Sequence, residues 1–469
     1  MSRKLKYKLM YLFMVLGCIG ILFLQGCKPA KENKNPLLPD LKLSRNDRIL
    51  ILAPHPDDEV LGCAGIIQKA VSMKIPVRIV FLTYGDNNQW SFFVYRKHPV
   101  IASKEARLMG MARHDEAIEA AKAMGVSPKN LIFLGYPDFR TLSIWNSHWG
   151  NAQPAESMLT RVKSVPYANA FRPGALYKGE EILKDLKSVL REFRPTKIFL
   201  SHPADHNPDH RSLYLFTRIA LWDIEKEMEP DLYPYLIHYK HWPEPRGYYP
   251  GEKIEPPHVF AGQAKWGSSK LNVQEVGCKD IAIKKHRSQY GYSSKYLTSF
   301  VRSNELFGDL PVIFLKKESF FESVTGDSGN LDKEMPEELT DNERASFVGF
   351  EERFMALQGD TLILSIKLSR PLGEAVGVSV SIFGYRFDRS FSEMPKLHIK
   401  LGAAGYEVYD EDKKLLPHII SVLREAKQIT FFVPLKVLGN PHKLLTSGRT
   451  YIADVPMDWV SWRLIELTP

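Results

Sequence analysis

Two clusters of histidine and carboxylate side chains carry the chemistry that this sequence offers. The first is His-Pro-Asp-Asp-Glu at residues 55–59, directly after the apolar run 49–53. A histidine and an aspartate three residues apart on one turn can bind the same cation, through an imidazole nitrogen and a carboxylate oxygen. Asp57 and Asp58 are neighbours and therefore point in different directions. One can bind a metal while the other faces the attacking water as a general base.

The second cluster is the segment SHPADHNPDHR at residues 201–211, which holds three histidines and two aspartates. It follows a predicted strand at 197–200. Either cluster alone could be a polar turn that begins a helix, since acidic residues there complement the helix dipole. Both clusters, however, come where a parallel strand is expected to end, and open α/β sheets bind their ligands at that edge. Together they favour a metal site.

The elements that must position these clusters alternate between strand and helix. Apolar runs bounded by turn residues predict strands at 49–53, 77–83, 131–134, 197–200 and 236–241. Periodic apolar positions predict helices at 60–73, 103–124, 180–193, 212–225 and 279–289. This order predicts an α/β domain over residues 45–295, with a Rossmann-like, mostly parallel sheet.

The two clusters together resemble the PIG-L (LmbE-like) family of zinc-dependent N-deacetylases, which remove acetyl from N-acetylglucosamine-type amines on a Rossmann-like fold. The resemblance rests on residues 55–59 and on Pro-Asp-His at 208–210, and it covers about residues 45–295. It implies a hydrolase that uses Zn²⁺. The zinc ligands that it implies are His55, Asp58 and His210.

The same resemblance assigns further roles. It implies that Asp57 is the general base and that Arg113 and Asp138 contact the substrate. Agreement extends to Glu116 and to His-Arg-Ser-Gln at 286–289.

The chain departs from the family at Asn207, where the usual residue is a histidine that stabilises the oxyanion. The amide NH₂ of Asn207 can still donate a hydrogen bond to an oxyanion, but it cannot protonate the leaving amine. Three routes stay open. Either His202 or His206 is the acid, or Asp57 carries the proton both ways, or the reaction is slow.

The first 26 residues predict a lipoprotein signal peptide. Four basic side chains precede an apolar run at 9–24, which is short for a membrane span. The run leads into Leu-Gln-Gly-Cys, which resembles a bacterial lipobox with Cys27 as the lipid-bearing residue, and Cys18 is a weaker rival. An uncleaved signal anchor is the alternative. Both readings place the protein in the cell envelope, outside the cytoplasm and held to a membrane, and residues 27–44 are then a polar tether.

Composition limits the partners. Without residues 1–26 the formal net charge falls from +9 to +5, because that segment carries four basic and no acidic side chains. Such a mild excess does not indicate nucleic-acid binding. Beyond residue 27 only Cys63 and Cys278 remain, which excludes a disulfide framework.

Two long loops above the predicted strand ends are rich in aromatic residues. The loop at 84–100 interleaves aromatic and amide side chains, which suits a sugar, although such rings can equally pack into the core. The loop at 138–177 contains Trp145 and Trp149 and is expected to be an insertion that shapes the cleft.

The C-terminal part has a different pattern. Period-two apolar runs at 362–368 and 376–382 are separated by an Arg-Pro-Leu-Gly turn, and further strands are expected up to residue 467. This predicts a smaller β-rich domain at 345–469, most simply a β-sandwich, after a connecting segment at 296–344. It is expected to pack against the catalytic domain or to hold glycan.

The sequence therefore predicts an envelope-anchored zinc hydrolase that deacetylates an N-acetylated amino sugar of an envelope or extracellular glycan. Asn207 supports an alternative, a glycan-binding lipoprotein with weak or no catalysis. A zinc amidohydrolase that acts on a different N-acyl amine is the third hypothesis.

Overall fold

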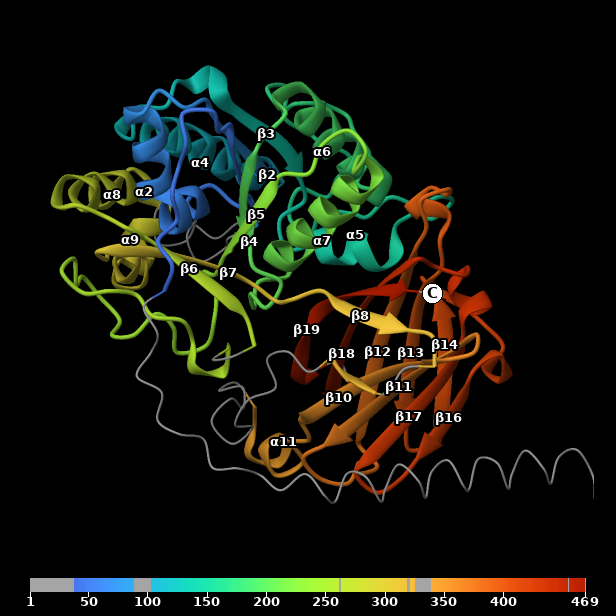
Figure 1. Cartoon of the computed structure of the whole chain (residues 1–469). Coiled ribbons are helices and arrows are strands. Elements are labelled where there is room, and N and C mark those ends of the chain that lie inside the picture. Colours follow the sequence, from blue (N-terminus) through green and yellow to red (C-terminus); the bar gives the residue numbers. More distant parts are fainter. Residues whose placement is uncertain are drawn as a thin grey trace, which may run out of the picture. The chain divides into compact units, whose positions relative to one another are not determined.

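A five-stranded parallel sheet forms the centre of the N-terminal half of the chain (Figure 1). This computed structural model describes residues 38–87, 103–260, 263–318, 321–324, 339–453 and 455–468. The strands are β1 (Ile49–Ala53), β2 (Val77–Thr83), β3 (Leu131–Tyr136), β4 (Lys197–Ser201) and β5 (Asp231–Tyr235). Their order is β3-β2-β1-β4-β5, and every neighbouring pair is parallel. The order reverses between β1 and β4, the position where doubly wound sheets open a crevice for a ligand.

Helices cover both faces of this sheet (Figure 1). On one face α8 packs against both α2 and α4, and on the other α7 packs against both α5 and α6. Their bounds are α2 (Asp58–Ser72), α4 (Ser103–Ala123), α5 (Thr141–Ser147), α6 (Gly179–Phe193), α7 (Pro208–Asp223) and α8 (Val273–Lys285), and α9 (Arg287–Leu297) follows α8. All residues of β1 are buried, because the sheet is covered on both sides. The predicted Rossmann-like fold is confirmed.

Two of the boundaries that differ from the sequence prediction lie near the second cluster. The fifth strand was expected at 236–241 but lies at Asp231–Tyr235 and includes Pro234. Proline is tolerated there because β5 is an edge strand, with β4 on one side only. Helix α7 begins at Pro208 rather than at 212, with Asn207 as its N-cap, so that His210 lies in its first turn.

Both segments that flank the predicted catalytic domain contribute to its surface. Strands β6 (Lys265–Lys270) and β7 (Asn304–Asp309) form an antiparallel pair, although β7 falls in the predicted connecting segment. Within the predicted tether, the N–H of Leu41 donates to the carbonyl oxygen of Ser268 at 2.7 Å. Cys27 and the apolar run before it lie outside the described residues. Among the residues that are described, no helix is long and apolar enough to cross a membrane.

The C-terminal part consists of two β-sheets that share one hydrophobic core. The seven-stranded sheet has the order β15 (Lys413–Lys414), β14 (Gly405–Asp410), β13 (Lys396–Gly402), β12 (Val376–Tyr385), β18 (Lys443–Ile452), β19 (Val455–Thr468), β8 (Ile313–Lys316). The five-stranded sheet has the order β16 (Ser421–Arg424), β17 (Gln428–Pro434), β11 (Thr361–Leu368), β10 (Phe350–Gln358), β9 (Glu322–Ser323). Leu364 of one sheet and Val380 of the other belong to the same buried cluster. Antiparallel pairing predominates, as the alternating runs predict.

Aromatic rings join the two domains. Residues Pro39–Pro469 form one compact unit that contains both of them. Trp145 of α5 is fully buried, and its ring lies 5.2 Å from Phe216 of α7, 5.6 Å from Phe383 of β12 and 6.0 Å edge-on from Trp462 of β19. Trp149 is buried in the same cluster. These tryptophans of the 138–177 loop therefore hold the C-terminal domain and do not shape a cleft.

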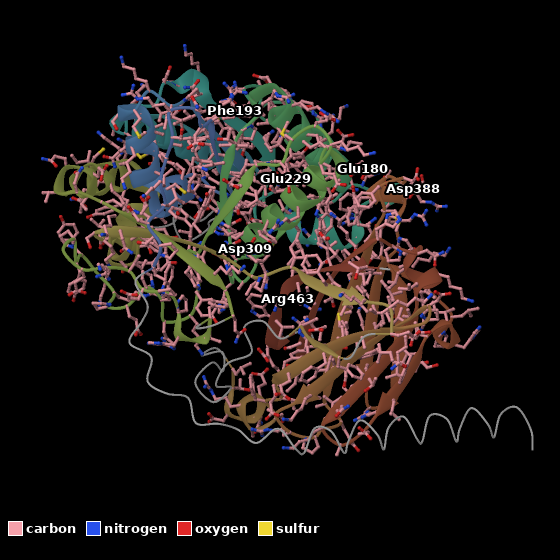
Figure 2. The ribbon with its side chains drawn as sticks, in the orientation of Figure 1. Glu180, Phe193, Glu229, Asp309, Asp388 and Arg463 are labelled. Carbon is pink, nitrogen blue, oxygen red and sulfur yellow. The ribbon has the colours of Figure 1, made fainter. Side chains whose placement is uncertain are left out.

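Polar contacts hold the segment that links the two domains. They involve Asp309 and Arg463, which are labelled in Figure 2. Asp309, the last residue of β7, accepts a hydrogen bond from the Tyr214 hydroxyl of α7 at 2.9 Å. Arg463 of β19 donates from Nη2 to the carbonyl oxygen of Pro311 at 3.1 Å. The chain between β7 and β8 is thus held from both domains.

We expect Trp145→Ala to lower the free energy of unfolding by about 3–5 kcal/mol, because truncating a buried tryptophan leaves a cavity. Urea denaturation followed by circular dichroism measures this. Leu416→Ala, at a side chain that is 64% exposed, is the control. It should change the same free energy by no more than about 0.5 kcal/mol. Equal midpoints for the two variants would contradict a shared interdomain core.

Candidate metal centre

The turn between β1 and α2 carries the first cluster. Asp58 is the first residue of α2, and its Oδ2 accepts a hydrogen bond from the backbone N–H of His55 at 3.0 Å. This bond closes the turn and brings both side chains to the same side. Both are buried, with exposed fractions of 6% for His55 and 1% for Asp58.

The second cluster meets the first at Asp58. Its Oδ2 lies 3.2 Å from His55 Nδ1 and 3.1 Å from His210 Nε2. One ligand atom from each of the three residues lies within 4.8 Å of the other two. They meet because β1 and β4 are neighbours in the sheet and each leads into one of the clusters. The structure thus brings together all three predicted ligands, two nitrogens and one oxygen, a donor set that zinc accepts.

The far nitrogen of each imidazole faces a carboxylate. His210 Nδ1 lies 3.1 Å from Asp205 Oδ2. His55 Nε2 lies 3.1 Å from both Asp138 Oδ1 and Asp209 Oδ2. A proton held on each of these far nitrogens leaves the lone pairs of His55 Nδ1 and His210 Nε2 toward Asp58. Histidine ligands of metals are oriented in this way, so the residues present fit a bound cation.

His55 also forms a second group with Asp138 and Asp209 whose atoms lie close enough to share a cation. The carboxylate of Asp209 is already occupied in this arrangement. Its Oδ1 accepts hydrogen bonds from the backbone N–H and the hydroxyl of Thr141, and its Oδ2 accepts one from the N–H of Phe139. The group around Asp58 is therefore the better candidate, and Asp209 is placed to orient His55.

Electrostatics in the cluster favour charge pairing. Burial lowers the pKa of His210, but Asp205 and Asp58 outweigh it and raise the pKa to about 9. Burial likewise opposes ionisation of Asp58, but the adjacent His210 and His55 hold the pKa of its carboxyl well below its usual range. Near pH 7 the ring of His210 is therefore protonated on both nitrogens and pairs with the negative carboxylate of Asp58, and a bound cation would displace the proton between them.

Asp57, the predicted general base, is held in a strained position. Its φ is 138°, a value that residues other than glycine rarely adopt. Its N–H donates to Glu59 Oε2 at 2.9 Å, and Glu59 Oε1 lies 3.1 Å from His286 Nε2. Next to His286, Ser288 donates to both carboxylate oxygens of Glu116. The residues at 116 and 286–289 thus support the turn that presents Asp57.

Arg113 supports the same turn. Its Nη2 donates to the carbonyl oxygen of Pro56 at 2.7 Å and lies 3.3 Å from Asp57 Oδ1. Burial raises the pKa of Asp57 to about 6, although Arg113 acts in the opposite direction. Arg113 and Asp138 thus contact residues of the turn, and the prediction that both bind substrate stays a prediction.

Asn207 has a structural function as well as its predicted one. Its Oδ1 accepts the N–H of Asp209 at 2.9 Å and so caps α7. With the oxygen used in the cap, the amide NH₂ is the part of this side chain that can donate to a substrate oxygen. Its role toward an oxyanion stays a prediction.

The two histidines considered as acids differ in setting. His202 is buried, its ring stacks on Trp266 at 5.6 Å, and burial lowers its pKa to about 3, so that it is neutral near pH 7. His206 has its ring 5.2 Å from Trp459 of β19. The guanidinium of Arg211 lies 4.1 Å over the same indole. The C-terminal domain thus contacts the loop of the second cluster.

Sequence reasoning assigned no role to three residues of this centre. Asp205 and Asp209 lie inside the second cluster. Their spacing from His210 did not indicate that each carboxylate would lie beside a ring nitrogen of a histidine. His238 follows β5, and its ring lies 4.8 Å from that of His210. The sequence did not indicate a role for His238, because the fifth strand was predicted at 236–241 and therefore included this residue. In the 84–100 loop, residues from 88 onward lie outside the described part.

The buried His-Asp-His cluster at the switch point of the sheet consists of residue types that hydrolytic metal sites use. Residues 50–221 match the model of the PIG-L family, which is described as GlcNAc-PI de-N-acetylase. This match confirms the resemblance that the motifs predicted. The similarity to this family covers residues 50–221.

Individual relatives are more distant. The chain is 25% identical over 198 residues to the 1D-myo-inositol 2-acetamido-2-deoxy-alpha-D-glucopyranoside deacetylase of Mycobacterium sp. (strain KMS), a match that covers 41% of this chain and 56% of that protein. The chain thus spans little more than half the length of the curated relatives that it matches.

Among solved structures, the N,N'-diacetylchitobiose deacetylase of Pyrococcus horikoshii has a TM-score of 0.30 at 20% identity, covering 54% of this chain and 75% of that one. The conserved protein TT1542 of Thermus thermophilus has a TM-score of 0.31 at 19% identity, covering 54% of this chain and 84% of that one. Likenesses of this size carry no conclusion about activity.

We expect Asp205→Asn to weaken metal affinity by about 10- to 100-fold, because the amide can no longer hold His210 as a charged partner does. With its oxygen in the place of Oδ2, the amide still accepts the backbone N–H groups of residues 237 and 238, although the N–H of Asn207 loses its acceptor Oδ1. Competition with a chromophoric chelator measures the affinity. Asp231→Asn, at a side chain that is 64% exposed, is the matched control. Equal affinities for both variants would refute the orienting role of Asp205.

Proposed function

We propose that this chain is a zinc-dependent hydrolase that removes the acetyl group from an N-acetylated amino sugar of the N-acetylglucosamine type. The observation that carries the proposal is the position of Asp58 Oδ2, 3.2 Å from His55 Nδ1 and 3.1 Å from His210 Nε2. Each imidazole is backed by a carboxylate on its other nitrogen, which is the arrangement of hydrolytic metal sites.

The ion would be held by His55, Asp58 and His210. When bound, such an ion polarises the amide carbonyl and makes water nucleophilic at neutral pH. Asp57 precedes Asp58 in the same turn, and its carboxylate is held 3.3 Å from Arg113 Nη2. It would take one proton from the water as the water oxygen bonds to the acetyl carbon.

Breaking of the carbon–nitrogen bond then releases acetate and requires a proton on the leaving amine. The amide of Asn207 cannot supply that proton. We assign this step to Asp57, which would return the proton taken from water. The NH₂ group of Asn207 would donate to the oxyanion, since the cap at the start of α7 fixes the side chain through its oxygen.

The names of the family model and of the mycobacterial relative support the substrate class, because both describe deacetylases of an acetylated glucosamine. Because Asn207 cannot act as an acid, it supports one rival, a glycan-binding protein without catalysis. Zinc absent from the purified chain, together with glycan binding that survives Asp58→Ala, would support that rival. Amine release from N-acetyl compounds other than sugars would support a different N-acyl substrate.

We also propose that the chain is exported and anchored in the cell envelope by lipid on Cys27. The basic residues, the apolar run and the Leu-Gln-Gly-Cys sequence support this, and an envelope or extracellular glycan would then be the substrate.

Removal of the metal with a chelator should abolish amine release from N-acetylglucosamine oligomers, and added Zn²⁺ should restore it. Asp57→Asn should retain the metal but lower kcat by about 10²- to 10⁴-fold, the usual effect of losing a general base. Fluorescamine detection of free amine and elemental analysis of the same samples give both readouts. Asp115→Asn, on the surface of α4, is the control. Undiminished kcat in Asp57→Asn with full metal content would sink the assigned base.

Cys27→Ser should abolish incorporation of a labelled fatty acid, because serine has no thiol to carry the lipid. Cys18→Ser tests the weaker rival and should leave the incorporation unchanged. If lipid incorporation survives Cys27→Ser, the assigned anchor is wrong.

A further inference from the structure

Phe139 occupies an unusual position beside the candidate metal centre. It directly follows Asp138 and has a φ of 59°, in the left-handed region that bulky side chains rarely adopt. Its side chain is nevertheless 46% exposed. The fold keeps a large apolar ring on a strained backbone position without burying it.

The backbone conformation has a clear reason that does not involve the ring. The N–H of Phe139 donates to Asp209 Oδ2, and the N–H of Thr141 donates to Asp209 Oδ1 at 3.1 Å. Asp209 in turn lies 3.1 Å from His55 Nε2. The turn therefore has this shape so that it can hold the carboxylate that orients His55. Glycine would adopt the same shape without steric cost, so the benzyl group must contribute something else.

The surroundings of the ring suggest what that is. The phenyl group stacks on His55, with ring centroids 6.3 Å apart and planes inclined by 29°. Beside it, Asn87 Nδ2 donates to the carbonyl oxygen of Asp138 at 3.4 Å and lies 3.7 Å from the sulfur of Met158. Met158 is itself 46% exposed. A half-exposed aromatic ring, a thioether and an amide thus lie beside the candidate ligand His55.

We propose that Phe139 is a stacking platform for a pyranose ring of the substrate. The apolar face of a pyranose packs on an aromatic ring, and its hydroxyl or acetamido groups need a hydrogen-bonding neighbour such as the Asn87 amide. Because Phe139 lies against His55, a sugar on this platform has its substituents next to the metal cluster. This deepens the proposed function and rests on it. Phe139 then makes the site selective for cyclic sugars over acyclic N-acetyl amines.

The test measures binding by titration calorimetry, with Asp57→Asn as the common background so that ligand is not turned over. Phe139→Gly should weaken binding of an N-acetylglucosamine oligomer by about 3- to 10-fold, the size of a lost aromatic contact. Its midpoint of thermal unfolding should stay equal or rise, because glycine suits the positive φ. Phe139→Tyr keeps the ring and should keep the affinity. Binding of an acyclic N-acetylated amine should be the same in all three proteins.

Phe387→Ala is the control, since this phenylalanine is 51% exposed but stacks on His442 in the C-terminal domain. It should leave oligosaccharide binding unchanged. The platform is overturned if Phe139→Gly binds the oligosaccharide as the background protein does, or if the background protein binds none. It is also overturned if Phe139→Gly loses thermal stability and metal together, which would mark the ring as packing for His55. The remaining outcome separates the two proposals. If oligosaccharide binding depends on Phe139 but the unmutated chain hydrolyses no N-acetyl compound, the proposed hydrolase activity is wrong and the stacking platform stands.

Discussion

The convergence of two imidazoles on one carboxylate oxygen, Asp58 Oδ2, is the constraint on which the rest of the centre depends. A buried charge of this kind is costly unless it is paired, so every neighbour must hold its partner in place. Asp205, Asp138 and Asp209 do so for the two histidines. The sheet makes this arrangement available, since adjacent parallel strands deliver both clusters to one edge.

Much of this could be predicted from the sequence because local signals and the fold agree. The apolar run at β1 and the residues that follow it indicated both the strand and the candidate ligands His55 and Asp58. The predictions that were wrong or missing depend on contacts between distant parts of the chain. Because proline is unusual inside a strand, β5 was not predicted at 231–235, and His238 was placed inside a strand rather than after it. The histidine partners of Asp205 and Asp209 can be identified only from the three-dimensional structure. The loop at 138–177 was expected to shape the cleft, but its Trp145 and Trp149 are buried against other rings of the protein. Whether an aromatic ring contacts ligand or protein is decided by distant residues such as Phe383.

The two domains are in contact beside the candidate metal centre as well as in the aromatic cluster around Trp145. Trp459 of β19 contacts both Arg211 and His206, which flank the ligand-bearing start of α7. The rim of the second cluster is therefore built from side chains of both domains. A gene fragment that stopped after β7 would remove Phe383, Phe391 and Trp462, the rings of the C-terminal domain that cover Trp145, and would expose Trp145 to water.

The pairing of β8 with β19 also sets an order of events during synthesis. Leu315 of β8 contacts Thr468 of β19 across 153 residues of chain, and the two strands run parallel at the edge of their sheet. A strand translated just after the α/β domain must therefore wait for nearly all of the sandwich before its backbone groups find a ladder. Until then it is an unpaired edge, open to aggregation or to binding by a chaperone.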